Sequence, residues 1–109
     1  MISNETFRQL ALGFPGAVEL PHFDRASFRV NKKIFATLLE KNRLAMVKLP
    51  LIAQSVFCDY DPSVIYPVPG SWGKQGATYI ELKKINKTVL REALQAAYAY
   101  LSEKKKKPS

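Results

Sequence analysis

The first apolar pattern in the chain has the period of an α-helix. Its apolar residues lie three or four positions apart, so they share one face of a helix predicted over Asn4–Leu12. Ser3 is a suitable N-cap, and Gly13 is expected to end the helix in the left-handed conformation that glycine adopts readily. Pro15 then prevents the helix from continuing. The residues of the apolar face are Phe7, Leu10, Ala11 and Phe14.

A longer pattern of the same kind lies near the C-terminus. It predicts a helix over Lys87–Glu103, with Asn86 as the N-cap. Because each of the two helices has a single apolar face, both are expected to pack on the same side of a sheet. The apolar stripe of the second helix consists of Val89, Leu90, Ala93, Leu94, Ala97, Tyr98 and Leu101.

Between the two helices, short apolar runs alternate with polar turns, which is the pattern of antiparallel strands joined by hairpins. A leading strand over Ala17–Leu20 can join the edge of the sheet. The order of elements predicts an α+β fold: an antiparallel sheet of about four or five strands, with the two helices on one face and the other face partly open. The main strands are predicted over Ala26–Val30, Ile34–Leu39, Leu44–Leu49 and Ala77–Leu82.

The segment between the last two predicted strands begins with a proline, which suits the first position of a helix. A short helix is predicted over Leu51–Cys58, with Ile52, Val56 and Phe57 facing inward. Residues 59–76 are predicted to be irregular, because they contain three prolines and three glycines. A loop of this length in a small domain is more often functional than accidental.

The length of 109 residues suits one domain, which is expected over residues 1–103. Seventeen Lys and Arg residues against nine Asp and Glu residues give a formal net charge of +8. Four of these lysines, Lys104–Lys107, lie in a basic tail over residues 104–109 that is expected to lack fixed structure. Without them, 13 basic and 9 acidic residues leave +4. The tail either keeps the protein soluble or binds phosphates.

The composition also excludes several classes of protein. Cys58 is the only cysteine, which excludes an internal disulfide and a zinc site built on several thiolates. His22 is the only histidine, which excludes a histidine-rich metal site within one chain. No apolar run approaches the ~18 residues of a membrane span, and no secretory signal is visible. We expect a cytoplasmic monomer without a metal, a cofactor or a membrane partner.

Read with particular residues, this order of elements resembles the MmcQ/YjbR family of small bacterial proteins. The likeness covers nearly the whole chain except Lys104–Lys107, and its motifs are loose patterns rather than a catalytic signature. The matching segments are Gly13–Ala17, Pro21–Phe23, Phe28–Val30, Lys33–Ala36, Val47–Leu49, Val68–Gly76 and Ala97–Tyr98.

The resemblance implies an α+β fold that is compared with CyaY-like (frataxin-like) folds and with the double-wing DNA-binding domain of a phage transcription factor. Members of the family are commonly labelled DNA-binding on this ground. The resemblance implies no enzymatic activity. A shared fold does not by itself determine function, so the DNA-binding label is an analogy.

The residues that could carry catalysis do not form a recognisable set. His22 is the only imidazole and Ser27 is near it in sequence, but the signature of a nucleophile elbow is missing. We expect His22 to order its loop through hydrogen bonds. Asp59 and Asp61 suit a turn better than a calcium loop, and Cys58 is expected to pack as a small apolar residue. We therefore expect that the protein is not an enzyme.

The first functional hypothesis is a module that contacts the phosphate backbone of double-stranded DNA. Basic residues lie in the predicted hairpin turns, and wing-like hairpins contact DNA through such tips. A solvated hairpin is also polar without any partner, so a coherent positive field over the tips would favour DNA binding. The candidate contacts are Lys32, Lys33, Lys41, Arg43, Lys48 and Lys74, together with the C-terminal lysines.

The alternative hypothesis is a domain that binds a small molecule or a protein between the sheet and the loop of residues 66–76. His22, Tyr66 and Trp72 would be its polar and aromatic elements. Trp72 can instead cap the core, with the glycines shaping the turn around it. A concave apolar pocket that reaches both Trp72 and His22 would favour the binding hypothesis.

Overall fold

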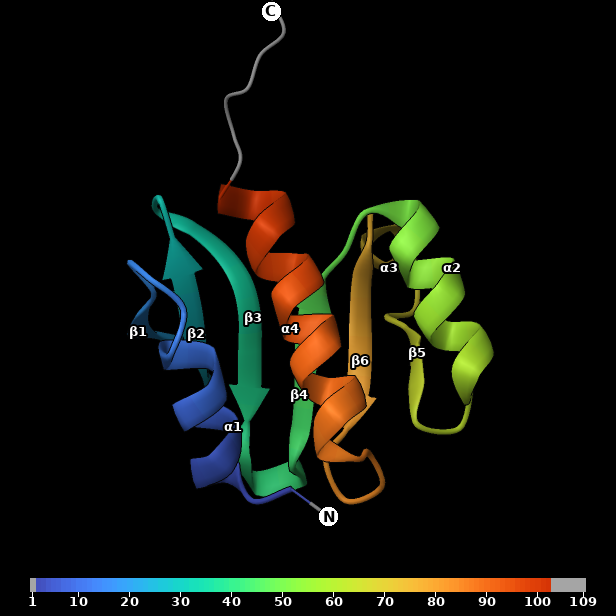
Figure 1. The fold of residues 1–109 in the computed structure, drawn as a ribbon, viewed down its shortest axis with the longest axis horizontal. Helices are drawn as coiled ribbons and strands as arrows, with labels where there is room; N and C mark the ends of the chain where they lie inside the picture. The colour runs from blue at the N-terminus through green and yellow to red at the C-terminus, as the bar shows by residue number, and fades with distance from the viewer. Residues whose placement is uncertain (1, 103–109) are drawn as a thin grey trace, which may run out of the picture.

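The computed structural model describes residues 2–102, which form four α-helices, six strands and a short 3-10 turn over Glu40–Asn42 (Figure 1). No helix in this part of the chain is long and apolar enough to cross a membrane. Glu103 and the expected tail over residues 104–109 lie outside the described residues. The helices are α1 (Asn4–Leu12), α2 (Leu51–Tyr60), α3 (Ser71–Lys74) and α4 (Lys87–Ser102). The strands are β1 (Val18–His22), β2 (Arg25–Val30), β3 (Lys33–Leu39), β4 (Leu44–Lys48), β5 (Ile65–Pro67) and β6 (Ala77–Glu81).

The six strands form one antiparallel sheet in the order β1-β2-β3-β4-β6-β5. The prediction of about four or five strands was too low, because residues 59–76 are not wholly irregular. They contain α3 and β5, and β5 pairs with Thr78–Ile80 of β6. Three residues that end in a proline carry too short an apolar run to be recognised as a strand from the sequence.

Proline occupies both edges of the sheet. Pro21 lies in β1 at one edge, and Pro67 lies in β5 at the other. A proline has no backbone N–H to offer a further strand, so it is tolerated at an edge and discourages pairing with another chain. The two prolines therefore help to explain why the sheet ends at these strands.

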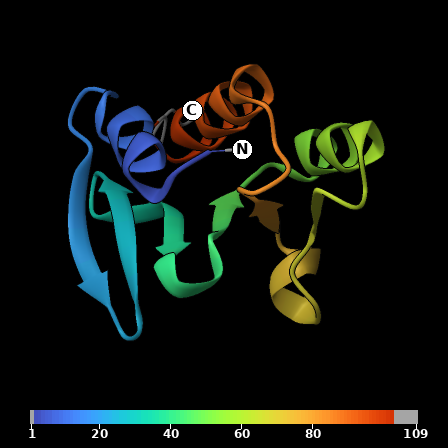
Figure 2. The same ribbon diagram turned by 90° about the horizontal axis from the view of Figure 1, so that it is seen from below.

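Helices α1, α2 and α4 cover one face of the sheet, while α3 and the turn between β1 and β2 extend on the other face (Figure 2). The prediction that the two long helices pack on one side agrees with this arrangement. The core lies between the helices and the sheet, and its large members are fully buried. They include Phe7, Phe28, Phe35, Leu38, Ile80, Leu90 and Leu94.

The helix caps are as predicted at the N-terminal ends and different at the end of α1. The Ser3 hydroxyl accepts a hydrogen bond from the Thr6 N–H at 3.0 Å, and the Asn86 side-chain oxygen accepts one from the Val89 N–H at 2.9 Å. Gly13 was wrongly predicted to be left-handed, since its φ is −73°. The left-handed glycine is Gly16, with φ +78°, where the chain turns toward β1.

The orientation of α2 was wrongly predicted at Ile52 and Val56, which are exposed, and correctly predicted at Phe57, which packs against the core. Gln54 is buried instead. Successive helical residues are rotated by about 100°, so turning Gln54 inward directs residues two positions away outward. The buried side-chain amide of Gln54 donates hydrogen bonds to the backbone carbonyls of Gly73 and Ala77. The apolar pattern of the sequence does not indicate this long-range contact.

Gly76 is a position at which a side chain is expected to destabilise the fold. Its φ is +109°, and a Cβ there would lie 2.1 Å from the Leu49 carbonyl oxygen. We expect Gly76→Ala to lower the free energy of unfolding by about 3 kcal/mol, through backbone strain and steric overlap together. Urea denaturation followed by circular dichroism measures this loss.

Gly16→Ala is the matched control. Gly16 also has a positive φ, but a Cβ added there would meet no atom within 4 Å. Strain alone is expected to cost about 1 kcal/mol at this position. Equal losses for the two variants would show that the contact with Leu49 is unimportant.

Candidate functional site

The open face of the sheet carries a continuous row of side chains across five strands. Strand register places Ser27, Thr37, Met46, Tyr79 and Tyr66 side by side in that order. Residues that pair across antiparallel strands point to the same face of the sheet. This face is not covered by the helices α1, α2 and α4 (Figure 2). Ser27 and Thr37 are buried, whereas Met46, Tyr79 and Tyr66 are half-buried, so solvent or a ligand reaches the row mainly at these three residues.

A groove of about 640 Å³ lies over this row, which forms its floor. One wall is the turn between β1 and β2, formed by residues 22–25, and the other is formed by Val68 and α3 with the following Gln75. Figure 2 shows that the turn and α3 extend on the same side of the sheet. Met46, Tyr79 and Thr37 contribute to the floor. We refer to this hollow as the open-face groove.

Two exposed aromatic residues line the open-face groove from opposite walls. Phe23 is 94% exposed and has a φ of +60°, and Trp72 is 68% exposed. The interpretation of Trp72 as a cap of the core was wrong. The accompanying expectation for the glycines is supported, because a Cβ on Gly73 would lie 1.9 Å from the Val68 carbonyl oxygen. The close turn leaves Trp72 on the surface.

His22 lies in the same groove as Trp72, as the binding hypothesis requires. Its ring contacts the Phe23 ring edge-on, with 4.8 Å between the ring centroids. Within residues 2–102 its side chain makes no hydrogen bond. The prediction that His22 orders its loop through hydrogen bonds is therefore not supported in this part of the chain. The imidazole is thus available to a ligand as a hydrogen-bonding group.

Lys48 places a positive charge in the open-face groove. It is half-buried, and among residues 2–102 it takes part in no ion pair or hydrogen bond. The other two charges in the lining are Asp24 and Arg25, which form an ion pair at 3.0 Å. The hydrogen bond from Arg25 lowers the pKa of Asp24 below its usual value. With that pair neutralised, Lys48 makes the groove attractive to one negative charge.

Tyr66 does not line the groove, although it was predicted to do so. Its hydroxyl donates a hydrogen bond to the Glu81 carboxylate, and its ring contacts Tyr79 edge-on, with 5.9 Å between the centroids. Tyr79 lines the groove, so Tyr66 supports a lining residue from the neighbouring edge strand. The hydrogen bond to Glu81, together with burial, raises the pKa of Tyr66 to about 12.

The six candidate DNA contacts do not form one cluster. Lys32 and Lys33 lie at the turn between β2 and β3, at the same end of the sheet as Lys48. Lys41 and Arg43 lie at the turn between β3 and β4, at the opposite end. The seven residues of β3 separate the two ends by about 20 Å, at roughly 3.3 Å per residue. Lys74 is exposed in α3.

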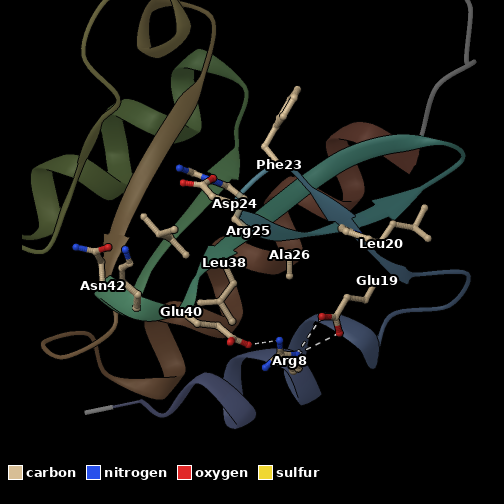
Figure 3. Close-up of a pocket in the computed structure, with 13 residues that line it drawn as sticks. Arg8, Glu19, Leu20, Phe23, Asp24, Arg25, Ala26, Leu38, Glu40 and Asn42 are labelled. Atoms are coloured by element: carbon tan, nitrogen blue, oxygen red, sulfur yellow. Dashed lines mark hydrogen bonds and ion pairs between the residues drawn. The ribbon is translucent and has the colours of Figure 1, made fainter.

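A second hollow of about 870 Å³ lies on the other side of the turn between β1 and β2 (Figure 3). Arg8 bridges Glu19 and Glu40 in its lining, with 3.1 Å between the Arg8 Nε and a Glu19 oxygen. The hydrogen bond to Glu40 is the largest of the causes that raise the pKa of Arg8. Because Arg8 already forms ion pairs with Glu19 and Glu40, these three residues are less available to a ligand than Lys48. The open-face groove is therefore the better candidate site. Lys41 also lines this second hollow.

Cys58 is half-buried and packs against the core, as expected of a small apolar residue. Burial raises the pKa of its thiol. Within residues 2–102, no group of three or more His, Cys, Asp and Glu side chains is arranged to hold a metal ion.

The sequence patterns missed Phe23, Met46 and Tyr79 as residues of the site. Phe23 carried a usable signal in the sequence, because a phenylalanine directly before Asp24, between two strands, is poorly placed to enter the core. In the structure it lies in the turn between β1 and β2 and is exposed. Met46 and Tyr79 alternate with buried neighbours and could be assigned to the open face. They lie side by side because β4 pairs with β6, and no pattern in the sequence predicts that pairing.

The hydrogen bond between Tyr66 and Glu81 predicts a specific alkaline titration. The hydrogen bond to the Glu81 carboxylate is the main cause of the raised pKa of Tyr66, and the carboxylate also repels the phenolate. Glu81→Gln offers only a neutral acceptor, so it is expected to lower the pKa of Tyr66 from about 12. The contribution of this interaction to folding is expected in full below about pH 10 and to be lost as the pH rises through about 12.

Ultraviolet difference titration measures this change, and a Tyr66→Phe variant isolates the signal of Tyr66. An unchanged titration of Tyr66 in Glu81→Gln would show that the carboxylate charge does not act on it.

Residues 12–100 match the model of the YjbR family. No curated protein sequence matches the chain significantly. The fold is similar to the crystal structure of the Deinococcus radiodurans protein DR2400, which carries the domain DUF419. That comparison has a TM-score of 0.83 and 17% sequence identity, and it covers 100% of this chain and 84% of the other.

The likeness to the Deinococcus radiodurans protein shows a shared α+β fold, because 17% identity is too low to carry more. The family match extends over most of the chain, from the end of α1 to the last turns of α4. It confirms the resemblance that the sequence motifs indicated. The chain belongs to the YjbR family.

Proposed function

We propose that the protein is a binding domain whose open-face groove takes a small planar aromatic ligand with one negative charge. One observation carries the proposal: His22, Lys48 and Trp72 line the same groove although they are far apart in the sequence. Among residues 2–102, Lys48 has no ion-pair partner. A concave pocket that reaches both His22 and Trp72 supports the binding hypothesis.

The lining matches the physical requirements of such a ligand. Ligand pockets of about 300–1,000 Å³ combine an apolar lining with a few polar groups that orient the ligand, and the groove of about 640 Å³ lies in this range. Phe23 and Trp72 offer exposed aromatic faces, and Met46 offers a polarisable apolar floor. Lys48 supplies the charge that pairs with an anionic group.

We propose binding rather than catalysis. Nucleophilic catalysis needs a hydroxyl or thiol held within hydrogen-bonding reach of a base. Within residues 2–102, the side chain of His22 bonds to no such group. The Ser27 hydroxyl, the nearest candidate in sequence, donates its hydrogen bond to the Leu20 carbonyl at 2.8 Å.

The fluorescence of Trp72, the only tryptophan, gives a direct measure of binding. We expect naphthalene-2-carboxylate to change it at lower concentration than the neutral naphthalene-2-carboxamide. Lys48→Met keeps most of the length of the side chain and removes its charge, so it is expected to weaken binding of the carboxylate about tenfold, the effect of roughly 1.4 kcal/mol. Binding of the carboxamide is expected to change little.

Lys84→Met is the matched control, because Lys84 is exposed and lies outside the groove lining. It is expected to leave both affinities unchanged. Equal binding of the two probes by the native protein, or an equal effect of the two lysine substitutions, would contradict the proposal.

A second candidate is contact with the backbone of double-stranded DNA, in the manner of a double-wing domain inside the cytoplasm. It is favoured by the distribution of charge. Asp24, Glu19 and Glu40 are engaged in ion pairs with arginines, whereas Lys32 and Lys33 form no ion pair within residues 2–102. These lysines are exposed at a hairpin turn, where they can approach phosphates without losing an internal contact.

Fluorescence anisotropy with a random-sequence duplex across a salt series tests this candidate on the full chain. If Lys32 and Lys33 each neutralise one phosphate, their joint replacement by Glu is expected to reduce the slope of log K against log salt by about 2. Joint replacement of Lys83 and Lys84 by Glu makes the same change of net charge at another turn. An equal effect of both pairs would indicate attraction by net charge alone and contradict a defined contact.

A further inference from the structure

The outer face of α2 carries an exposed apolar surface, and the Tyr60 hydroxyl at its end accepts a hydrogen bond from the Asn86 side chain at 3.2 Å. Ile52 is 82% exposed, Val56 63%, Tyr60 57% and Leu51 55%. Ile52, Val56 and Tyr60 are four positions apart, so they form one stripe along the helix, and Leu51 lies beside its start. A contiguous stripe of this kind marks an interaction surface more often than single exposed apolar residues do.

The stripe is additional to the face with which α2 packs on its own domain. That inner face consists of Ala53, Gln54, Phe57 and Cys58, which are buried or half-buried. A helix that is apolar on both sides is usually covered on both sides. Since the inner side is already covered by the sheet, the outer side is the one left open to another molecule.

We propose that this stripe pairs with the same stripe of a second copy of the chain, with the two α2 helices antiparallel and a two-fold axis near Val56. In this register Ile52 contacts Tyr60 of the other copy, and each pair occurs twice. A two-fold interface must be complementary to itself, and an uncharged stripe with even spacing on both sides of its centre meets that condition.

The charge distribution favours a second copy over a charged partner. The chain carries a formal net charge of +8, so most approaches of two copies bring like charges together. The ten residues of α2 contain one charged residue, Asp59, and no cation that would attract an acidic protein. The α2 face is therefore a part of the surface on which two copies meet with little repulsion.

The area is sufficient for a weak dimer. Covering four large side chains in each copy buries on the order of 1,000 Å² in total, which is near the lower limit for a specific interface. The expected complex is thus reversible and concentration-dependent. Helix α2 lies on the face of the sheet opposite to α3 and the turn between β1 and β2 (Figure 2), which form the walls of the open-face groove. The dimer therefore leaves both grooves open and does not depend on the proposed ligand.

Sedimentation equilibrium of the full chain, from roughly 5 µM to roughly 1 mM, tests the proposal. The average mass is expected to rise from 12.3 kDa toward twice that value. Val56→Glu places two carboxylates at the two-fold axis and is expected to keep the protein monomeric. Because Val56 is exposed, the variant is expected to keep the native circular dichroism spectrum.

Leu20→Glu is the matched control, since it introduces the same charge at another exposed apolar residue, in β1. It is expected to leave the dimer unchanged. The antiparallel register is tested by Ile52→Lys and Tyr60→Glu, each of which is expected to weaken the dimer, while the double variant restores it through two Lys–Glu pairs. A native protein that stays monomeric, a dimer that survives Val56→Glu, or a double variant without recovery would overturn the proposal.

Discussion

The buried side-chain amide of Gln54 is the contact on which the less regular half of the molecule depends. Its nitrogen lies 2.9 Å from the Gly73 carbonyl oxygen, 3.2 Å from that of Ala77 and 3.1 Å from the Thr78 hydroxyl. It thereby joins α2 to α3 and to the start of β6. A buried amide donor left without an acceptor costs on the order of 1–3 kcal/mol, so Gln54 holds the three elements together.

Both candidate surfaces follow from this amide. Holding the Gly73 carbonyl positions α3, and α3 presents Trp72 at the wall of the open-face groove. Turning Gln54 inward also determines the rotation of α2 about its axis, which leaves Ile52 and Val56 in solvent. A polar residue at the centre of α2 thus accounts for an aromatic wall on one face of the sheet and an apolar stripe on the other.

The open-face groove combines features that a folded protein does not need for stability. Phe23 and Trp72 remain exposed, and Lys48 is half-buried without a counter-charge within residues 2–102. Burying an unpaired charge is costly, and exposed aromatic rings gain nothing from the hydrophobic effect. A ligand with a planar ring and one anionic group would relieve both costs at once, which is the physical basis of the proposed binding function.

Local signals in the sequence determined the regular elements and the family. The bounds of α1, the caps at Ser3 and Asn86, and the strands of the central sheet were predictable, because period and capping chemistry act within a few residues of each other. Candidate residues His22, Trp72 and Lys48 could also be named in advance. Only the tertiary structure decided that they share a groove, that β5 completes the sheet and that Tyr66 contacts Tyr79 from outside the groove. These outcomes depend on contacts between segments far apart in the chain, which leave no periodic pattern in the sequence.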